Sequence, residues 1–398
     1  MGGLAMSLSM TTREPVEISS AGTTRVAPGK ARLESLDVLR GGTIVLMILA
    51  NASGGVAHGY RPLVHAAWNG LTFADVVFPC FLFIVGVSLV LSQDGRTREG
   101  ASRRALARKA LARAAILFLI GVALNGFPGY HFATLRFYGV LQRIALCYFL
   151  AVMLYLWLKP GTLVLATAAI LLGYYVLLRW VPVPGYGVPG VDVAFLDPHG
   201  NLPAWVDRRI FPASHLYLQG FYDPEGLLSS LPALATTLIG VLTGVELLKR
   251  KADSWRRLFV AGMSCLAAGL LWSYWFPLNK RLWTSSFVLV NAGIGLIAFG
   301  LLRWWLDGRM GHGRALLPFR IFGMNALAAY VFSEIFALSL ASVQLPDDGM
   351  TFRHWLFHPL PVLFPDRYVA GLVGAILYVG VCFLPVWLLY RRRIFLKV

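Results

Sequence analysis

Ten runs of mostly apolar residues, each close to 20 residues long, recur along the chain and limit what it can fold into. A helix of about 20 apolar residues crosses the hydrocarbon core of a bilayer. Hydrophobic residues make up 57% of the 398 residues and charged residues only 14%, whereas soluble domains average about 45–50% and about 25%. The sequence therefore predicts an all-α, polytopic membrane helix bundle with about ten transmembrane helices. The expected spans are 38–55, 72–92, 107–125, 138–158, 161–180, 227–248, 257–276, 284–303, 320–342 and 369–390.

The Lys and Arg residues are concentrated in alternate loops. The net charge of +17 would indicate a nucleic-acid partner in a soluble protein. In a membrane protein, however, Lys and Arg collect in the cytoplasmic loops. With the N-terminus in the cytosol, 26 of the 36 basic residues fall on that side. We therefore expect both termini to be cytosolic, and we expect the lipid bilayer rather than nucleic acid as the partner of this charge.

The segments outside the spans are short. Residues 1–31 are rich in Ser, Thr and Gly without an apolar core, so we expect a disordered cytosolic tail. Residues 32–398 are expected to form a single transmembrane domain. The longest polar interval within it, 181–226, contains several Pro and Gly and is expected to form short helices on the outer side.

The sequence does not favour a metal site. All four Cys residues lie inside apolar runs, where they are typical of small buried hydrophobes. No His pair shows the spacing of metal ligands with Cys or Glu nearby.

The densest polar feature is the first outer hairpin. Asn51 ends the first span, His65, Trp68 and Asn69 lie in the loop, and Asp75 enters the second span by about one turn. An ionisable residue inside a span is costly and points to function, although Asp75 could equally serve as a helix cap. A carboxylate can orient an imidazole, and an amide can donate to a developing oxyanion. Asn51, His65 and Asp75 together therefore suit acyl transfer.

Further polar residues lie at a similar depth in other spans. Charges of both signs from several spans converge on the outer half, which predicts a polar cavity opening outward. Arg143 needs a partner in a membrane, and Glu225 or Asp75 is a suitable neutralising group. The residues expected to contribute to substrate binding are Trp68, Asn69, Gln142, Arg143, Glu225, Asn279, Lys280, Trp283 and Asn325.

A second polar group is expected on the inner side. Asp37 and Arg40 lie three residues apart at the start of the first span, and Lys397 follows three consecutive arginines at the end of the chain. Basic groups there are suited to the phosphates of a cytosolic nucleotide cofactor. The preference of Lys and Arg for the cytoplasmic side explains them equally well.

These residues also carry a resemblance to a known family. The stretches RLESLDVLRGGTIVLMILAN and HAAWNGLTFADVVFPCFLF resemble the heparan-α-glucosaminide N-acetyltransferase family, including its bacterial members. So do LRFYGVLQRIALCYF, DPEGLLSSLPALATTLIGVLTG, PLNKRLWTSSFVL, FGMNALAAYV and YRRRIFLKV. The resemblance therefore covers nearly all of the chain from residue 32 onward.

The resemblance implies an activity and a set of roles. The family's lysosomal member transfers acetyl from cytosolic acetyl-CoA to a terminal glucosamine across the membrane. The family's catalytic histidine is matched by His65, and its neighbouring Asn and Asp by Asn51 and Asp75. A homodimer and a multi-pass location in the bacterial inner membrane are also implied.

We therefore expect an acetyl-CoA-dependent N-acetyltransferase that acts on an outward-facing amino sugar. His65 is expected to act as a general base, although a covalent acetyl-histidine route stays open. The alternatives are an amino-sugar transporter or permease, an O-acyltransferase of cell-envelope glycans, and a non-catalytic scaffold.

Overall fold

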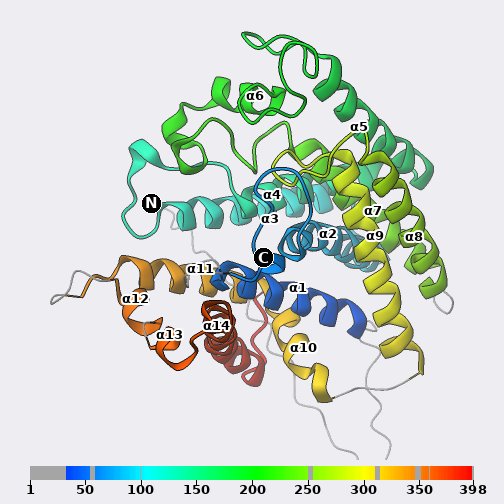
Figure 1. Ribbon diagram of the computed structural model, residues 1–398. Helices are drawn as coiled ribbons and strands as arrows, with labels where there is room; N and C mark the ends of the chain where they lie inside the picture. Colours follow the sequence, from blue (N-terminus) through cyan, green and yellow to red (C-terminus); the bar gives the residue numbers. More distant parts are fainter. Residues whose placement is uncertain are drawn as a thin grey trace, which may run out of the picture.

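The computed structural model describes residues 33–53, 59–98, 100–249, 254–309, 314–345, 351–357 and 359–396. The expected tail 1–31 and Lys397 lie outside these ranges. In the described part of the chain the regular structure is helical, and the predicted all-α class is confirmed (Figure 1). The long helices are α1 (Glu34–Ser53), α2 (Phe73–Arg98), α3 (Arg103–Gly126), α4 (Val140–Trp157), α5 (Pro160–Trp180), α7 (Ser230–Lys249), α8 (Ser254–Trp272), α9 (Ser285–Leu302), α11 (Ala326–Ser342) and α14 (Arg367–Arg391). The shorter ones are α6 (Leu202–Ile210), α10 (Leu317–Met324), α12 (Phe352–Phe357) and α13 (Leu360–Leu363).

Each of the ten expected apolar runs coincides with helix. Among the described residues, seven helices are long and apolar enough to cross a membrane, or eight if α10 and α11 count as one bent span. Helices α3 and α8 cover the other two apolar runs. The sequence therefore located the helices of the bundle correctly.

One expected span is broken. A continuous helix was expected over 320–342, but α10 ends at Met324 and α11 starts at Ala326, at an angle of 86° to it. Asn325, at the break, donates from Nδ2 to the carbonyl of Ile394 at 3.1 Å, and its Oδ1 accepts from the amide of Leu396 at 3.0 Å. These bonds to the C-terminal segment hold the break in place of a continuous helical turn.

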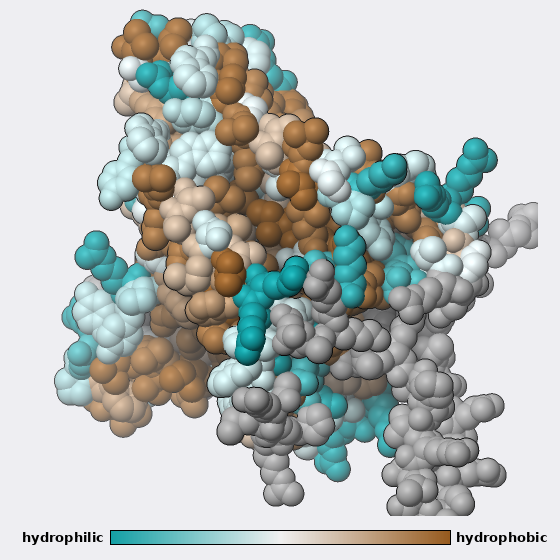
Figure 2. All heavy atoms as spheres, turned by 90° about the vertical axis from the view of Figure 1, so that its right-hand side faces the viewer, coloured by the Kyte–Doolittle hydropathy of each residue, from teal (hydrophilic) through white to brown (hydrophobic). Residues whose placement is uncertain are grey.

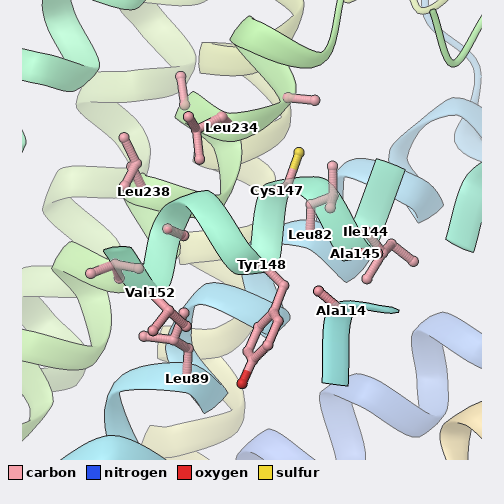
Figure 3. Close-up of a cluster of buried hydrophobic side chains, with 14 of the residues drawn as sticks. Leu82, Leu89, Ala114, Ile144, Ala145, Cys147, Tyr148, Val152, Leu234 and Leu238 are labelled. Atoms are coloured by element: carbon pink, nitrogen blue, oxygen red, sulfur yellow. The ribbon is translucent and has the colours of Figure 1, made fainter. Parts of the chain in front are cut away.

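The apolar side chains form two main blocks. Figure 3 shows part of the first, which we call the α2 block because α2 packs there with α3, α4 and α7. The second, the α1 block, joins α1, α10, α11 and α14. Helix α10 lies very close to α1, because a Cβ added to Gly41 would lie 1.6 Å from the carbonyl oxygen of Phe319. Residues of both blocks line the cavity described below.

The surface of the bundle formed by α5 and α8 is apolar, as contact with lipid requires. Large hydrophobic side chains are exposed along α5 and α8, among them Leu165, Leu172, Val260 and Leu271. Figure 2 shows apolar side chains over much of the face that these helices help to form. In water such an apolar surface would mark an interaction site, whereas in a bilayer it is the surface that contacts the lipid chains.

The segment 181–226 forms short helices, as predicted. It contains α6 and two 3₁₀ turns, η3 (Ala213–His215) and η4 (Tyr217–Gln219). It reaches the loop between α1 and α2, because Trp68 donates from Nε1 to the carbonyl of Leu196 at 2.8 Å and its ring meets that of Tyr222 edge-on. The segment therefore covers the end of the bundle that carries His65.

Candidate active site

His65 and Asp75 are in direct contact. Nδ1 of His65 lies 2.8 Å from Oδ1 of Asp75, in the first turn of α2. The other carboxylate oxygen accepts from the amides of Ala66 and Thr72 and from the Thr72 hydroxyl, at 3.0–3.1 Å. Asp75 is fully buried, whereas 45% of the His65 side chain is exposed. Because a carboxylate only accepts, Nδ1 carries a proton and Nε2 is left as the basic nitrogen of the neutral ring.

Lys280 lies beside this pair. Its Nζ is 3.0 Å from Nδ1 and 3.2 Å from Nε2 of His65, and 3.5 Å from Oδ1 of Asp75. Burial lowers the pKa of Lys280, although the charge of Asp75 opposes this shift. The side chain of Asn279 fixes the turn that carries Lys280, because it donates to Oδ1 of Asn69 and accepts from the amide of Leu282. This loop joins α8 to α9, so residues far apart in the sequence meet at the imidazole.

Trp283 follows in the same loop and forms part of the cavity wall. Its φ of +54° lies in the left-handed region, which is unusual for a bulky residue. Nε1 donates to the Thr236 hydroxyl at 3.1 Å, and the ring packs edge-on against Phe78. The Arg143 guanidinium lies 5.1 Å from the ring centre. These contacts hold the wall next to Lys280 in one arrangement.

Arg143 is buried without the carboxylate partner that the sequence suggested. Its Nη2 donates to the carbonyl of Gly226 and to the hydroxyl of Ser229. Its Nε and Nη1 have no hydrogen-bond partner. No ion pair joins Arg143 to Glu225 or Asp75 among the described residues, because those carboxylates bind other groups.

A network of charges borders the cavity close to segment 181–226. Arg136 binds Asp223 through Nε at 2.7 Å and Nη2 at 2.5 Å, and Nη2 also reaches Glu225 at 2.5 Å. Burial opposes ionisation of Glu225, but the charge of Arg136 lowers its pKa overall. Nearby Asp207 accepts from the amides of Asp223 and Leu227, and burial raises the pKa of Asp207 to about 7. This network anchors segment 181–226 to the bundle.

A single elongated cavity connects these groups. Its volume is about 750 Å³, and its lining includes α2 residues from Ala74 to Ser92, which lie about 27 Å apart along the helix axis. That distance approaches the roughly 30 Å thickness of a hydrocarbon core. The charged and polar lining residues are Arg40, Asn51, His65, Ser88, Ser92, Arg113, Asn125, Arg136, Tyr148, Tyr217, Glu225, Lys280, Arg281, Tyr330 and Glu334. Basic groups outnumber acidic ones, so the cavity is suited to an anionic ligand.

The end of the cavity remote from His65 is built around Arg40. Its guanidinium donates to Ser88 at 2.7 Å, and to Asp37 and the carbonyl of Gly323 at 3.2 Å. Arg113 lines the same cavity and donates to the hydroxyl of Tyr148. Two guanidinium groups among hydroxyl side chains are a suitable site for phosphate. By contrast, no three His, Cys, Asp or Glu side chains lie together as metal ligands in the described ranges.

The residues singled out from the sequence fall into three groups. Asn51, His65, Arg40, Glu225, Lys280 and Trp283 line the cavity, and Asp75 touches it through His65. Lys397 lies outside the described residues. The rest lie outside the cavity lining: Asp37, Trp68, Asn69, Arg143, Asn279 and Asn325 form side-chain hydrogen bonds, whereas the buried Nε2 of Gln142 has no hydrogen-bond partner.

The structure gives Asn51 a different neighbour from the one expected, and it adds lining residues that the sequence did not select. Asn51 does not contact His65 but donates to Oε1 of Glu334 at 3.2 Å. Tyr330 and Glu334 both line the cavity from α11. Their spacing of four residues, continued by Ala326, places them on one helix face, and that spacing is the pattern that would have identified them.

Comparison with known proteins identifies the family of the chain. The family model "Heparan-alpha-glucosaminide N-acetyltransferase, catalytic" matches residues 32–270, which is more than half of the chain. The human heparan-alpha-glucosaminide N-acetyltransferase is 28% identical over 432 residues, covering 94% of this chain and 61% of the human protein. The mouse protein is 28% identical over 357 residues, covering 76% of this chain and 53% of its own length. The chain thus spans a little more than half the length of these relatives. It belongs to the heparan-alpha-glucosaminide N-acetyltransferase catalytic family.

Proposed function

We propose that this chain is a transmembrane acetyltransferase that moves acetyl from acetyl-CoA to the amino group of an amino sugar such as a terminal glucosamine. The observation that carries the proposal is the contact between His65 and Asp75 in a cavity that runs about 27 Å along α2. We propose that donor and acceptor enter this cavity from opposite ends. Family membership supports the same reaction.

The end of the cavity at Arg40 is the proposed donor site. Arg40 and Arg113 would bind the phosphates of acetyl-CoA, and the apolar length of the cavity would hold its pantetheine arm. The thioester would then lie near His65. We propose that this route replaces any alternation of access between the two sides of the membrane.

His65 is the proposed general base. As the amine nitrogen attacks the thioester carbonyl, a C–N bond forms, and Nε2 takes the proton that the nitrogen loses. The C–S bond then breaks, and the same proton passes to the departing sulfur, which leaves as the free thiol. Asp75 holds the ring through Nδ1. Lys280 and the second amide hydrogen of Asn51 are the donors that we assign to the carbonyl oxygen.

The positions of Lys and Arg support an orientation. We propose that both termini face the cytosol, with the Arg40 end inside, His65 outside, and the chain in the inner membrane of a bacterium. A second copy of the chain is the proposed partner in a homodimer. Reporter fusions at the C-terminus test the orientation, and the mass of the detergent-solubilised protein tests the dimer.

The central experiment follows thiol release from acetyl-CoA by purified protein with a panel of amino sugars. General-base catalysis typically contributes about 10²–10⁴-fold, so His65→Ala should slow release by that factor. His199, which is exposed and outside the cavity lining, provides the control variant His199→Ala. If His65→Ala stays within a few-fold of the parent protein, the assignment is wrong.

The same preparation separates the alternative functions. Uptake of labelled amino sugar into vesicles without acetyl-CoA would identify a permease, and acetyl found on a hydroxyl would identify an O-acyltransferase. A burst of acetylated enzyme without acceptor would replace direct transfer by an acetyl-histidine route.

A further inference from the structure

The wall formed by α11 presents a carboxylate to the cavity. Ala326, Tyr330 and Glu334 line it from one helix face, over about 12 Å of helix. Glu334 lies at the end of this row, where α11 meets the last turn of α1. There Nδ2 of Asn51 donates to Oε1 of Glu334 at 3.2 Å. This end of α11 therefore shares a wall with the outer end of α1.

Glu334 differs from the other acidic groups of the site in its partners. Glu225 binds Arg136 at 2.5 Å, and Asp75 lies 3.5 Å from Nζ of Lys280. Within the described ranges, no Lys or Arg forms an ion pair with Glu334. Its partner, the Asn51 amide, is neutral and cannot compensate a negative charge. The cavity wall thus contains a carboxylate without a basic partner.

A carboxylate withdrawn from bulk water is stable only with a compensating partner. An amino sugar at neutral pH supplies one, because its amino group is largely an ammonium ion. A sugar that offers only hydroxyl groups supplies none. The wall at Glu334 therefore distinguishes two acceptor classes that the chemistry of His65 alone treats alike.

We propose that Glu334 binds the ammonium group of the acceptor, and that this contact selects a primary amine over a hydroxyl. The inference rests on the proposed acetyltransferase function and assigns to Glu334 the recognition of the acceptor's amino group. Asn51 is the positioning residue in this account, because its amide fixes the carboxylate at the cavity wall. Before transfer the bound ammonium gives up one proton to water, and the free amine then attacks the thioester as described above, so no covalent step involves Glu334.

The test measures binding and turnover separately, on the full chain in detergent. Binding of glucosamine and of glucose is followed by calorimetry, and the KM for each co-substrate is followed by thiol release. Glu334→Gln keeps the shape and removes the charge, while Glu334→Asp keeps the charge. The matched control is Glu246→Gln, because Glu246 pairs with Arg257 outside the cavity lining.

Losing a charge-assisted hydrogen bond should raise the glucosamine KM of Glu334→Gln by about 10- to 100-fold. The acetyl-CoA KM should stay unchanged, Glu334→Asp should keep most of the preference for the amine, and Glu246→Gln should match the parent. An unchanged glucosamine KM in Glu334→Gln overturns the proposal. Equal binding of glucosamine and glucose by the parent protein also overturns it, and this result needs no variant.

The two proposals fail in different ways. If the parent protein binds glucosamine but transfers no acetyl, and Glu334→Gln abolishes that binding, the transferase function falls and the role of Glu334 stands. If the parent transfers acetyl and Glu334→Gln does so with the same KM, the role of Glu334 falls alone.

Discussion

Replacing Asp75 by Asn tests the proposed site most directly, because the surrounding hydrogen bonds dictate how the amide must turn. Oδ2 of Asp75 accepts from three donors, the amides of Ala66 and Thr72 and the Thr72 hydroxyl. An amide nitrogen at that position would face two N–H groups, which no hydrogen bond can satisfy. The Asn oxygen therefore takes this place, and its NH₂ group faces Nδ1 of His65.

The consequence is that the imidazole of His65 adopts the other tautomer. Nδ1 of His65 must then accept a hydrogen bond, so the ring proton moves to Nε2, and the nitrogen nearest the cavity loses its basic lone pair. Reversing the tautomer of a carboxylate-oriented histidine lowers kcat by about 10⁴-fold in other enzymes. We expect a loss of about 10³–10⁴-fold here. Three of the four hydrogen bonds at residue 75 stay unchanged and the fourth reverses its direction, so the free energy of unfolding should fall by only about 1–3 kcal/mol.

The assay compares kcat for thiol release with the melting temperature of the same preparation. A buried carboxylate that only caps α2 would lower the melting temperature of Asp75→Asn and leave kcat per folded molecule nearly unchanged. The catalytic account predicts a large fall in kcat with a small fall in melting temperature, together with an unaltered KM for acetyl-CoA. A kcat within tenfold of the parent protein would refute the reasoning.

Three further predictions concern other parts of the molecule. Arg40→Gln should raise the KM for acetyl-CoA about tenfold or more while lowering kcat less, because a charged partner for phosphate is lost; steady-state kinetics with varied donor check this. The pKa of Asp207 is raised to about 7 by burial, so its contribution to stability is complete below about pH 3.8 and is lost as the pH rises through 7. The melting temperature should therefore fall between about pH 4 and pH 7 and level off above that, and the fall should be smaller in Asp207→Asn. Gly41→Ala places a Cβ 1.6 Å from a backbone oxygen of Phe319, whereas a Cβ at Gly42 meets nothing within 4 Å. The first change should cost about 1–3 kcal/mol or more, while Gly42→Ala should be neutral or stabilising, and unfolding in detergent compares them.

The positions of the helices could be read from the sequence because membrane insertion is a local property. A run of about 20 apolar residues becomes helical wherever it lies, since only internal hydrogen bonds satisfy its backbone in lipid. The expected span 161–180 therefore coincides with α5, which begins at Pro160 and ends at Trp180. The short helices of the polar segment 181–226 were expected from the length of that segment alone.

The break between α10 and α11 had no such local cause. Asn325 stands in an apolar run that reads as one span, and the groups that hold it, Ile394 and Leu396, lie about 70 residues later in the chain. A pattern of hydropathy contains no information about that contact. Prediction failed here because the deciding bonds are tertiary.

The same distinction between local and tertiary contacts applies to the candidate site. The contact of His65 with Asp75 spans ten residues, and the hairpin between α1 and α2 brings the two together. Lys280 comes from a loop 215 residues away, and its place beside the imidazole depends on the packing of α8 and α9. The sequence named all three residues, but it grouped Asn51 with His65 and Asp75 and gave no indication that this amide contacts Glu334.

Polar residues in a membrane domain are ambiguous in sequence because they must be satisfied either by the protein or by a ligand. Asn279 belongs to the first kind, since its side chain donates to Asn69 and accepts from the amide of Leu282. Glu334 belongs to the second, since it faces the cavity and its hydrogen-bond donor is neutral. Asn279 borders an expected span and Glu334 lies within another, yet hydropathy ranks the two residues alike. The hydrogen-bond and ion-pair partners in the folded chain distinguish a residue that fixes a loop from one that can bind a cationic ligand. This difference is the reason to test Glu334 rather than Asn279 for acceptor binding.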